Sequence, residues 1–224
     1  MAYVILISLG FIPSLAWLFF FLMEDVHPEP KKMILKAFIA GAAITFVAIF
    51  FQIYFQKAIN FFSLQDAHPL PFFLFALIEE ILKFFAAWLI VRKSRFFDEP
   101  IDAMVYMIVA ALGFALVENV AIAVNIGEIS GAASAITIRF VGATLLHALS
   151  PAIVGYYWAK GMINPGTMKI MVLKGLAWAA IIHTLFNYIV AVSGDAVMAY
   201  PTVFLAIIAL FIFWDFDKVK TKNI

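Results

Sequence analysis

Cysteine is absent from the chain. Its absence excludes disulfide bonds, thiolate nucleophiles and metal sites built on cysteine, although it leaves the cellular compartment undecided. Charge is also scarce, because only 13% of the residues are charged and the formal net charge is +1. No basic face is therefore available to neutralise the phosphates of a nucleic acid, and we expect no nucleic-acid partner.

Hydrophobic residues are abundant instead, at 66% of the 224 residues, against roughly half in soluble domains. Because a membrane crossing needs about 20 apolar residues, the sequence predicts an all-α, polytopic transmembrane helix bundle in the cell membrane. The predicted spans are residues 2–23, 33–55, 72–91, 103–126, 138–159, 170–192 and 196–214. Their connections are short, so we expect residues 1–224 to form a single transmembrane domain. The first span has no basic segment before it and no cleavage site after it, which indicates an uncleaved helix and not a signal peptide.

Lysine and arginine alternate from one side of this predicted bundle to the other. Eleven of them lie in the odd-numbered connections and the C-terminal tail: Lys31, Lys32, Lys36, Arg92, Lys93, Arg95, Lys160, Lys169, Lys218, Lys220 and Lys222. The other side has two, Lys57 and Arg139. The positive-inside rule therefore predicts an N-terminus outside and a C-terminus in the cytoplasm, which requires an odd number of spans.

A pair of glutamates interrupts the third predicted span. Glu79 and Glu80 lie in the middle of the apolar run 72–91, where each charged side chain costs roughly 2.5 kcal/mol or more. Lys83 lies four residues after Glu79 and three residues after Glu80, so a helix brings its ammonium group to the same face. We expect Glu79 to be its better-aligned partner and Glu80 to point elsewhere, toward neighbouring helices. Two costly carboxylates favour a functional site, with a structural ion pair as the alternative.

Other polar residues are predicted to lie at the same depth. Counted from the outer end of each span, Glu118, His147 and His183 fall level with the glutamate pair. At 1.5 Å per residue, this layer lies roughly 10–14 Å below the outer face. Asn187 shares the helix face of His183 because it follows four residues later.

Three further residues are expected to support this layer. Lys83 can neutralise a carboxylate. Asn119 and Arg139 could instead have purely structural roles. Asn119 would serve in packing, and Arg139 would extend to the lipid headgroups.

Two histidines and several carboxylates in a partly dry site support two hydrolytic mechanisms. In one, Glu118, His147 and His183 bind a zinc-like ion while Glu80 acts as general base. In the other, a carboxylate activates water without a metal, and His183 with Asn187 stabilises the oxyanion. No H-E-x-x-H or G-x-S-x-G motif is present to decide between them.

Five motifs follow one another through predicted spans three to six. They are Glu79-Glu80-x-x-Lys83, Asp102-Ala-Met-Val-Tyr106, Gly113-Phe114-Ala-Leu-Val-Glu118-Asn119, Arg139 with His147, and His183-x-x-x-Asn187. In order, spacing and membrane placement they resemble the PrsW family of membrane proteases. They are more distantly similar to the CAAX prenyl endopeptidases and their Abi relatives. In that group a histidine stands in place of Glu118, and an arginine one position later stands in place of Lys83, so the departures favour PrsW.

The resemblance to the PrsW family implies a membrane-embedded endopeptidase that makes the first, extracytoplasmic cut in a single-span membrane protein. It further implies that this substrate is an anti-sigma factor, whose cleavage activates a stress sigma factor. Carried over by motif, Glu79 and Glu80 would be essential, and Glu118, His147 and His183 would complete the site. The catalytic core would then occupy spans three to six, residues 72–192.

A proton-coupled transporter or channel is the competing function, because intramembrane Glu, His and Lys also build proton relays. Transport would favour polar groups across the whole membrane, whereas the cytoplasmic half of every predicted span is almost purely apolar. A non-catalytic scaffold would explain the glycines but not the clustered acids. We therefore predict a membrane-embedded protease that cuts single-span membrane proteins near the extracytoplasmic face.

Overall fold

The computed structural model describes residues 1–25, 27–61, 69–193 and 199–220. Within these ranges every regular element is a helix, which confirms the predicted all-α class. The elements are α1 (Ala2–Leu22), α2 (Lys31–Phe61), α3 (Pro69–Val91), α4 (Pro100–Ile126), α5 (Ile129–Val141), α6 (Ala143–Ile163), the 3₁₀ helix η1 (Pro165–Thr167), α7 (Met168–Val192) and α8 (Ala199–Lys220).

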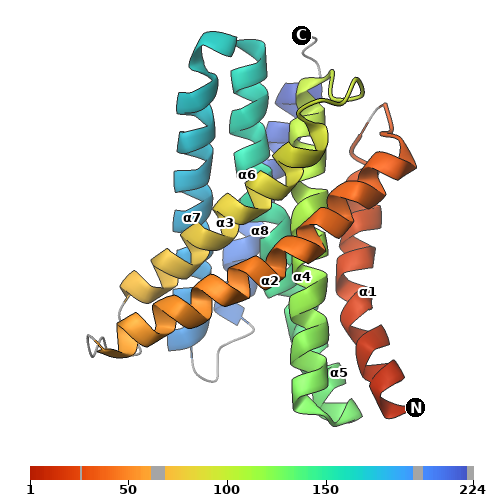
Figure 1. The fold of residues 1–224 in the computed structure, drawn as a ribbon, viewed down its shortest axis with the longest axis vertical. Coiled ribbons are helices and arrows are strands. Elements are labelled where there is room, and N and C mark those ends of the chain that lie inside the picture. The colour runs from red at the N-terminus through yellow and green to blue at the C-terminus, as the bar shows by residue number, and fades with distance from the viewer. Residues whose placement is uncertain (26, 62–68, 194–198, 221–224) are drawn as a thin grey trace.

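In the part of the chain that the structure describes, six segments are long and apolar enough to cross a membrane. They are Ala2–Leu22, Lys31–Lys57, Pro100–Ile126, Ile129–Ile163, Pro165–Val192 and Ala199–Lys220. The 23 residues of α3 add a seventh long helix, whose apolar run contains Glu79, Glu80 and Lys83. α1 begins at the opposite end of the bundle from the end of α8 (Figure 1). The predicted polytopic membrane bundle is confirmed, whereas the orientation of its termini stays a prediction.

The fifth predicted span is divided into two helices. We expected one helix over 138–159, but α5 ends at Val141 and α6 begins at Ala143. Gly142 between them has φ −106° and ψ −106°, which is not a helical conformation. The preceding residues, expected to be a connection, form α5 because their small and apolar side chains pack against α1 and α4. Arg139 therefore lies in the last turn of α5 and not at the start of a spanning helix.

Two other predicted boundaries are affected. α2 continues to Phe61, about a turn and a half beyond the predicted end at residue 55. The predicted start of the last span, residue 196, lies outside the described residues, and α8 begins at Ala199.

α4 is the central helix of the bundle and is buried along most of its length. It packs most extensively against α6, α2 and α1. At the crossing with α2, a Cβ on Gly41 would lie 1.8 Å from the carbonyl oxygen of Ala110. A Cβ on Gly113 would lie 2.0 Å from that of Phe38. The two glycines thus allow the backbones of α2 and α4 to touch.

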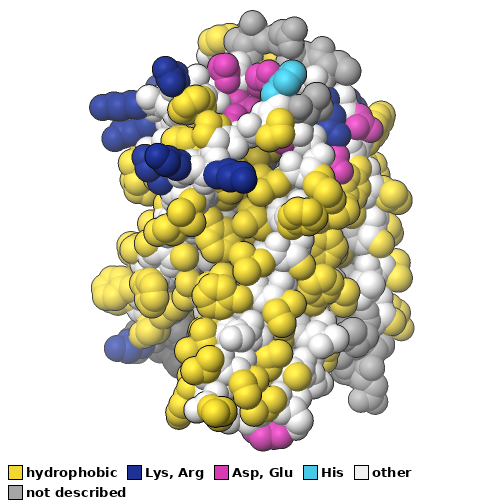
Figure 2. Space-filling view, turned by 90° about the vertical axis from the view of Figure 1, so that its right-hand side faces the viewer, with side chains coloured by type: hydrophobic (Ala, Val, Ile, Leu, Met, Phe, Trp, Pro, Cys, Tyr) yellow, Lys and Arg dark blue, Asp and Glu magenta, His cyan; other side chains and the backbone are white. Residues whose placement is uncertain are grey.

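The outer surface matches a membrane environment. Figure 2 shows hydrophobic side chains covering the middle of one face, while Lys and Arg gather with Asp, Glu and His toward one end. Residues that contribute to the exposed apolar surface include Phe19, Leu35, Phe46, Leu173 and Leu210. Glu79, Glu80, His147 and His183 are not part of this surface, because their side chains are buried.

Candidate metal centre and active site

The five ionisable residues predicted at one depth meet in the interior of the bundle. α3 carries Glu79 and Glu80, α4 carries Glu118, α6 carries His147 and α7 carries His183. All but Glu118 are buried, and the Glu118 side chain is 24% exposed. Four helices that are distant in sequence thus contribute to one polar centre.

Lys83 is fully buried and contacts both glutamates of α3. Its Nζ donates to Glu79 Oε2 at 3.2 Å and to Glu80 Oε1 at 3.0 Å. The expectation that Glu80 would point away from Lys83 is therefore wrong. Residues at i+3 and i+4 are both within reach of a flexible lysine side chain. One ammonium group thus lies between two carboxylates that would otherwise repel each other.

Glu80 orients the imidazole of His183. His183 Nδ1 lies 2.8 Å from Glu80 Oε1. Because an ionised carboxylate only accepts hydrogen bonds, Nδ1 carries the proton of the neutral ring. Ser150 Oγ donates to the same Glu80 oxygen at 3.0 Å. The unprotonated nitrogen of His183, Nε2, then lies 3.8 Å from Glu79 Oε2.

Glu118 orients His147 in the same way, but through the other ring nitrogen. His147 Nε2 lies 2.9 Å from Glu118 Oε2 and donates its proton to that oxygen. Nδ1 is left as the acceptor, and Lys83 Nζ donates to it at 2.8 Å. The same Nδ1 lies 3.9 Å from Glu79 Oε2. Both histidines thus bind a carboxylate on one side and face Glu79 on the other.

Three potential ligand atoms converge as a result. Glu79, His147 and His183 each offer one such atom, and these atoms lie within 4.8 Å of one another. Histidine ligands of metals usually donate their second nitrogen to a carboxylate, as both histidines do here. Two imidazole nitrogens and one carboxylate oxygen suit zinc with an open fourth position. The residues therefore fit a divalent metal ion.

This group differs in one residue from the ligand set expected from the sequence, which was Glu118, His147 and His183. Glu118 lies behind His147, on the far ring nitrogen. Glu79 instead faces both histidines. The sequence places Glu79 and Glu118 at the same depth, and only their side-chain contacts show which of them faces the histidines.

The balance of charge also suits a bound cation. Glu79, Glu80 and Glu118 contact two cationic side chains, Lys83 and Arg139. With both histidines neutral, three negative charges against two positive charges leave an excess of one negative charge. Within the described part of the chain, Glu80 Oε2 is buried without a hydrogen-bond partner. A buried charge in this position is costly unless a cation or a proton compensates it.

Arg139 and Asn119 join three helices beside this centre. Arg139 Nη2 donates to Glu118 Oε2 at 3.0 Å, and its Nε donates to Asn119 Oδ1 at 2.6 Å. Asn119 Nδ2 in turn donates to Thr144 Oγ1 at 3.0 Å. Arg139 therefore points into the bundle and holds Glu118, and does not extend to the headgroups.

Asn187 lies one turn beyond His183 on α7. Together with Arg139 it lines a cavity of about 190 Å³, whose wall also includes Gly142 at the break between α5 and α6. Phe186 and Pro201 contribute apolar surface to the same cavity. The cavity thus adjoins the residues that hold Glu118.

Comparison with known proteins adds the decisive observation. The model of the PrsW family of intramembrane metalloproteases matches residues 29–214. The chain belongs to the PrsW family. It is therefore a multi-pass membrane peptidase, and membership decides against the transporter alternative.

Curated relatives of the PrsW family extend over most of the chain. "Protease PrsW" of Oceanobacillus iheyensis is 29% identical over 208 residues, which are 92% of this chain and 93% of the relative. "Protease PrsW" of Geobacillus kaustophilus is 33% identical over 69% of this chain and 66% of its own length. "Protease PrsW" of Bacillus subtilis is 27% identical over 97% of this chain and 94% of its own length. No solved structure matches the chain.

The description of PrsW proteins as metalloproteases agrees with a donor group of one glutamate and two histidines.

Three contacts of the site were not anticipated from the sequence. Gln52 Nε2 on α2 donates to Glu79 Oε1 at 2.8 Å, and Ser150 and Thr144 bind as described above. Ser150 and Thr144 lie three residues after and before His147, so helical spacing from that histidine could have identified them. Gln52 had a weaker signal, as a lone amide within an apolar span.

Proposed function

We propose that this PrsW-family peptidase cleaves single-span membrane proteins near the extracytoplasmic face. The observation that supports the proposal best is the pair of histidines, each bound to a carboxylate by one nitrogen and facing Glu79 with the other. Such an arrangement presents three ligand atoms inside a bundle whose surface is otherwise apolar. Because the metal would be enclosed by transmembrane helices, the peptide bond must be delivered within the bilayer or at its edge.

In this proposal Glu79, His147 and His183 hold a zinc-like ion. The ion, when bound, lowers the pKa of a water molecule and polarises the scissile carbonyl. Glu80 and Glu118 keep the ligating nitrogens free of protons, because each accepts the ring proton on the opposite nitrogen. Arg139 holds Glu118 in place for this purpose.

Glu80 is also the proposed general base. Its Oε1 accepts from Lys83, Ser150 and His183, and Oε2 is the oxygen without a partner among the described residues. Oε2 therefore accepts the proton of the attacking water and returns it to the amine nitrogen as the C–N bond breaks. Asn187 lines the adjoining cavity, and we assign to it a hydrogen bond to the substrate backbone.

The depth of the site supports a cut near one membrane surface. Glu79 and Glu80 are ten and eleven residues from the start of α3 at Pro69. At 1.5 Å per residue this corresponds to about 15 Å along the helix, and less in depth because α3 is inclined in the bundle (Figure 1). The distribution of lysine and arginine assigns that surface to the outside.

The substrate we propose is a single-span anti-sigma factor, cut first on its extracytoplasmic side. The test is co-expression with a tagged anti-sigma factor from the same genome, followed by detection of the fragment. Glu80→Gln and His183→Ala should each reduce cleavage by about 100-fold or more, and the exposed Glu128→Gln should not. Unchanged cleavage in both site variants would refute the proposed site. Cleavage of other single-span reporters, but of no anti-sigma factor, would refute the substrate and leave the peptidase in place.

A further inference from the structure

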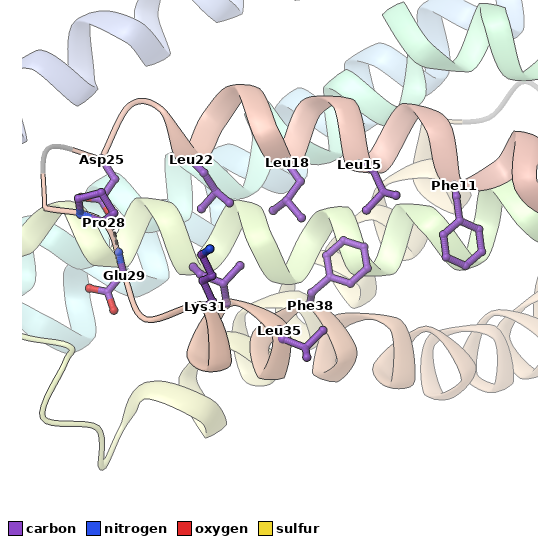
Figure 3. A pocket seen from close by; sticks show the side chains of 11 residues that line it. Phe11, Leu15, Leu18, Leu22, Asp25, Pro28, Glu29, Lys31, Leu35 and Phe38 are labelled. Atoms are coloured by element: carbon purple, nitrogen blue, oxygen red, sulfur yellow. Dashed lines mark hydrogen bonds between the residues drawn. The ribbon is translucent and has the colours of Figure 1, made fainter.

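A groove runs along the lipid-facing side of the bundle between α1 and α2. Its volume is about 490 Å³. Figure 3 shows Phe11, Leu15, Leu18 and Leu22 in a row on α1, opposite Leu35 and Phe38 on α2. Leu15 and Leu35 are 46% and 58% exposed, so the groove is open to the surrounding bilayer. It is separate from the metal centre, whose residues do not line it.

The length of this groove matches one leaflet of a bilayer. From Phe11 to Leu22 the helix advances eleven residues, or about 16 Å at 1.5 Å per residue. Half of a hydrocarbon core of about 30 Å is nearly the same distance. A transmembrane helix of about 20 residues would extend beyond the groove. An acyl chain of a single leaflet therefore fits the groove better than a partner helix does.

The end of the groove is charged in a way that an amphipathic ligand can use. Asp25 and Glu29 line it there, beyond Leu22, and Lys31 lies across from Leu22 (Figure 3). The Asp25 carboxylate accepts the backbone N–H groups of His27 and Glu29, which hold it at the mouth of the groove. Glu29 accepts the hydroxyl of Tyr106. Its carboxylate also lies close to those of Asp98 and Asp102.

This acidic end lacks a counter-ion within the described residues. Neither Asp25 nor Glu29 has an ion pair with a lysine or arginine in the described ranges of the chain. Burial raises the pKa of Asp25 and that of Glu29 above their ordinary values. Lys31 provides a separate positive charge on the rim of the groove. A ligand that presents an ammonium group beside a phosphate would satisfy both sets of charges.

We propose that this groove binds a phospholipid with a primary-amine, zwitterionic headgroup, of the phosphatidylethanolamine type. One acyl chain lies along Leu15, Leu18 and Phe38. The ammonium group donates hydrogen bonds to Asp25 and Glu29, and the phosphate contacts Lys31. An anionic headgroup would pair with Lys31 but would bring a negative charge next to the two carboxylates. A choline headgroup has the positive charge but no N–H donor.

The test compares lipids that the purified protein retains. Nanodiscs or mixed micelles with equal amounts of phosphatidylethanolamine, phosphatidylglycerol and phosphatidylcholine are exchanged onto the protein, and bound lipid is counted by native mass spectrometry. We expect the amine lipid to be enriched by about fivefold to tenfold over each competitor. Glu29→Gln should reduce that enrichment to near one, and Leu18→Trp should reduce the total lipid retained in the groove.

Matched controls lie elsewhere on the same molecule. Asp217→Asn changes an exposed acid on α8, and Leu210→Trp enlarges a leucine that is 73% exposed on α8. Neither should change the enrichment or the amount retained. Equal retention of the three lipids by the wild-type protein would overturn the proposal, and so would equal effects of the groove and control variants. If Glu29→Gln does not fold, Lys31→Gln tests the same end of the groove by selectively weakening retention of phospholipids against a phosphate-free glycolipid.

Discussion

At the residue scale, the two histidines decide the chemistry of the centre through the proton that each carries. His147 donates from Nε2 to Glu118, and His183 donates from Nδ1 to Glu80. A ring with one proton has its lone pair on the other nitrogen. Because the carboxylates lie on opposite sides of the site, both lone pairs face Glu79. The two histidines thus use different nitrogens to face the same carboxylate.

The first prediction separates the ligand from the residue behind it. Glu79→Gln should remove the metal from the purified protein, because it removes an anionic oxygen from the donor group. Glu118→Gln should weaken zinc affinity by about 10-fold to 100-fold and retain activity at excess zinc, since the amide oxygen can still accept from His147. Elemental analysis and zinc titration measure both effects. A Glu118→Gln protein without metal, beside a Glu79→Gln protein that retains it, would restore the ligand set expected from the sequence.

The second prediction concerns Lys83, whose ammonium contacts Glu79 Oε2 and His147 Nδ1. These residues belong to the donor group, so the ammonium and a metal ion compete for one place. Lys83→Met should lower the stability of the metal-free protein by about 3 kcal/mol or more, because buried carboxylates lose their cation. The same variant should gain more in Tm from added zinc than the wild-type protein does. Lys174→Met, at an exposed position on α7, is the control. An equal zinc-induced shift in Lys83→Met and wild type would contradict competition.

At the element scale, the close crossing of α2 and α4 fixes the positions of two helices that contribute residues to the site. Gln52, which donates to Glu79, is on α2, while Glu118 is on α4. The two backbones touch at Gly41 and Gly113, which leaves no space for a Cβ at either position. Separation of these helices would therefore move Gln52 relative to Glu118 and the other site residues of α4.

The third prediction follows from this crossing. Gly113→Ala should reduce the free energy of unfolding by about 1–3 kcal/mol, because α2 and α4 must move apart. A thermal-unfolding series in detergent measures the loss. Gly166→Ala is the matched control, since its Cβ would meet only Asn164 Oδ1 at 3.8 Å. Equal stability of the two variants would show that the backbones are not in contact at Gly113.

At the scale of the whole molecule, three of the connections, α1–α2, α3–α4 and α6–α7, lie at one end of the bundle (Figure 1). Eight of the eleven basic residues counted on the predicted inner side lie within or beside these three turns: Lys31, Lys32, Lys36, Arg92, Lys93, Arg95, Lys160 and Lys169. The structure shows that they share one end, and the positive-inside rule assigns that end to the cytoplasm.

The fourth prediction tests this assignment directly. Because the chain has no cysteine, a single introduced thiol is the only one in the protein. Glu128→Cys, at the α4–α5 turn, should react with a membrane-impermeant maleimide in intact cells. Gly166→Cys, at the α6–α7 turn, should react only after the membrane is opened. The reverse pattern would invert the orientation and move the proposed cut to the cytoplasmic side.

Much of this protein follows from its sequence alone. Long apolar runs have to become helices in a bilayer, because no water is available there for unpaired backbone groups. Charged side chains are costly in the bilayer, so the few that lie within those runs indicate the functional site. Glu79, Glu80, Lys83, His147 and His183 do meet. The long apolar helices and the shared depth of these polar residues were likewise predictable from composition and spacing.

Only the tertiary structure decided which atoms face one another. The sequence could not distinguish Glu79 from Glu118 as the partner of the histidines, because the rotation of α3 and α4 about their axes depends on packing with other helices. Nor did it indicate the break at Gly142, which turns Arg139 toward Glu118. The depth of a residue in the membrane follows from the number of residues between it and the end of its helix. The direction of a side chain depends on contacts between helices distant in sequence, and these exist only once the bundle has assembled.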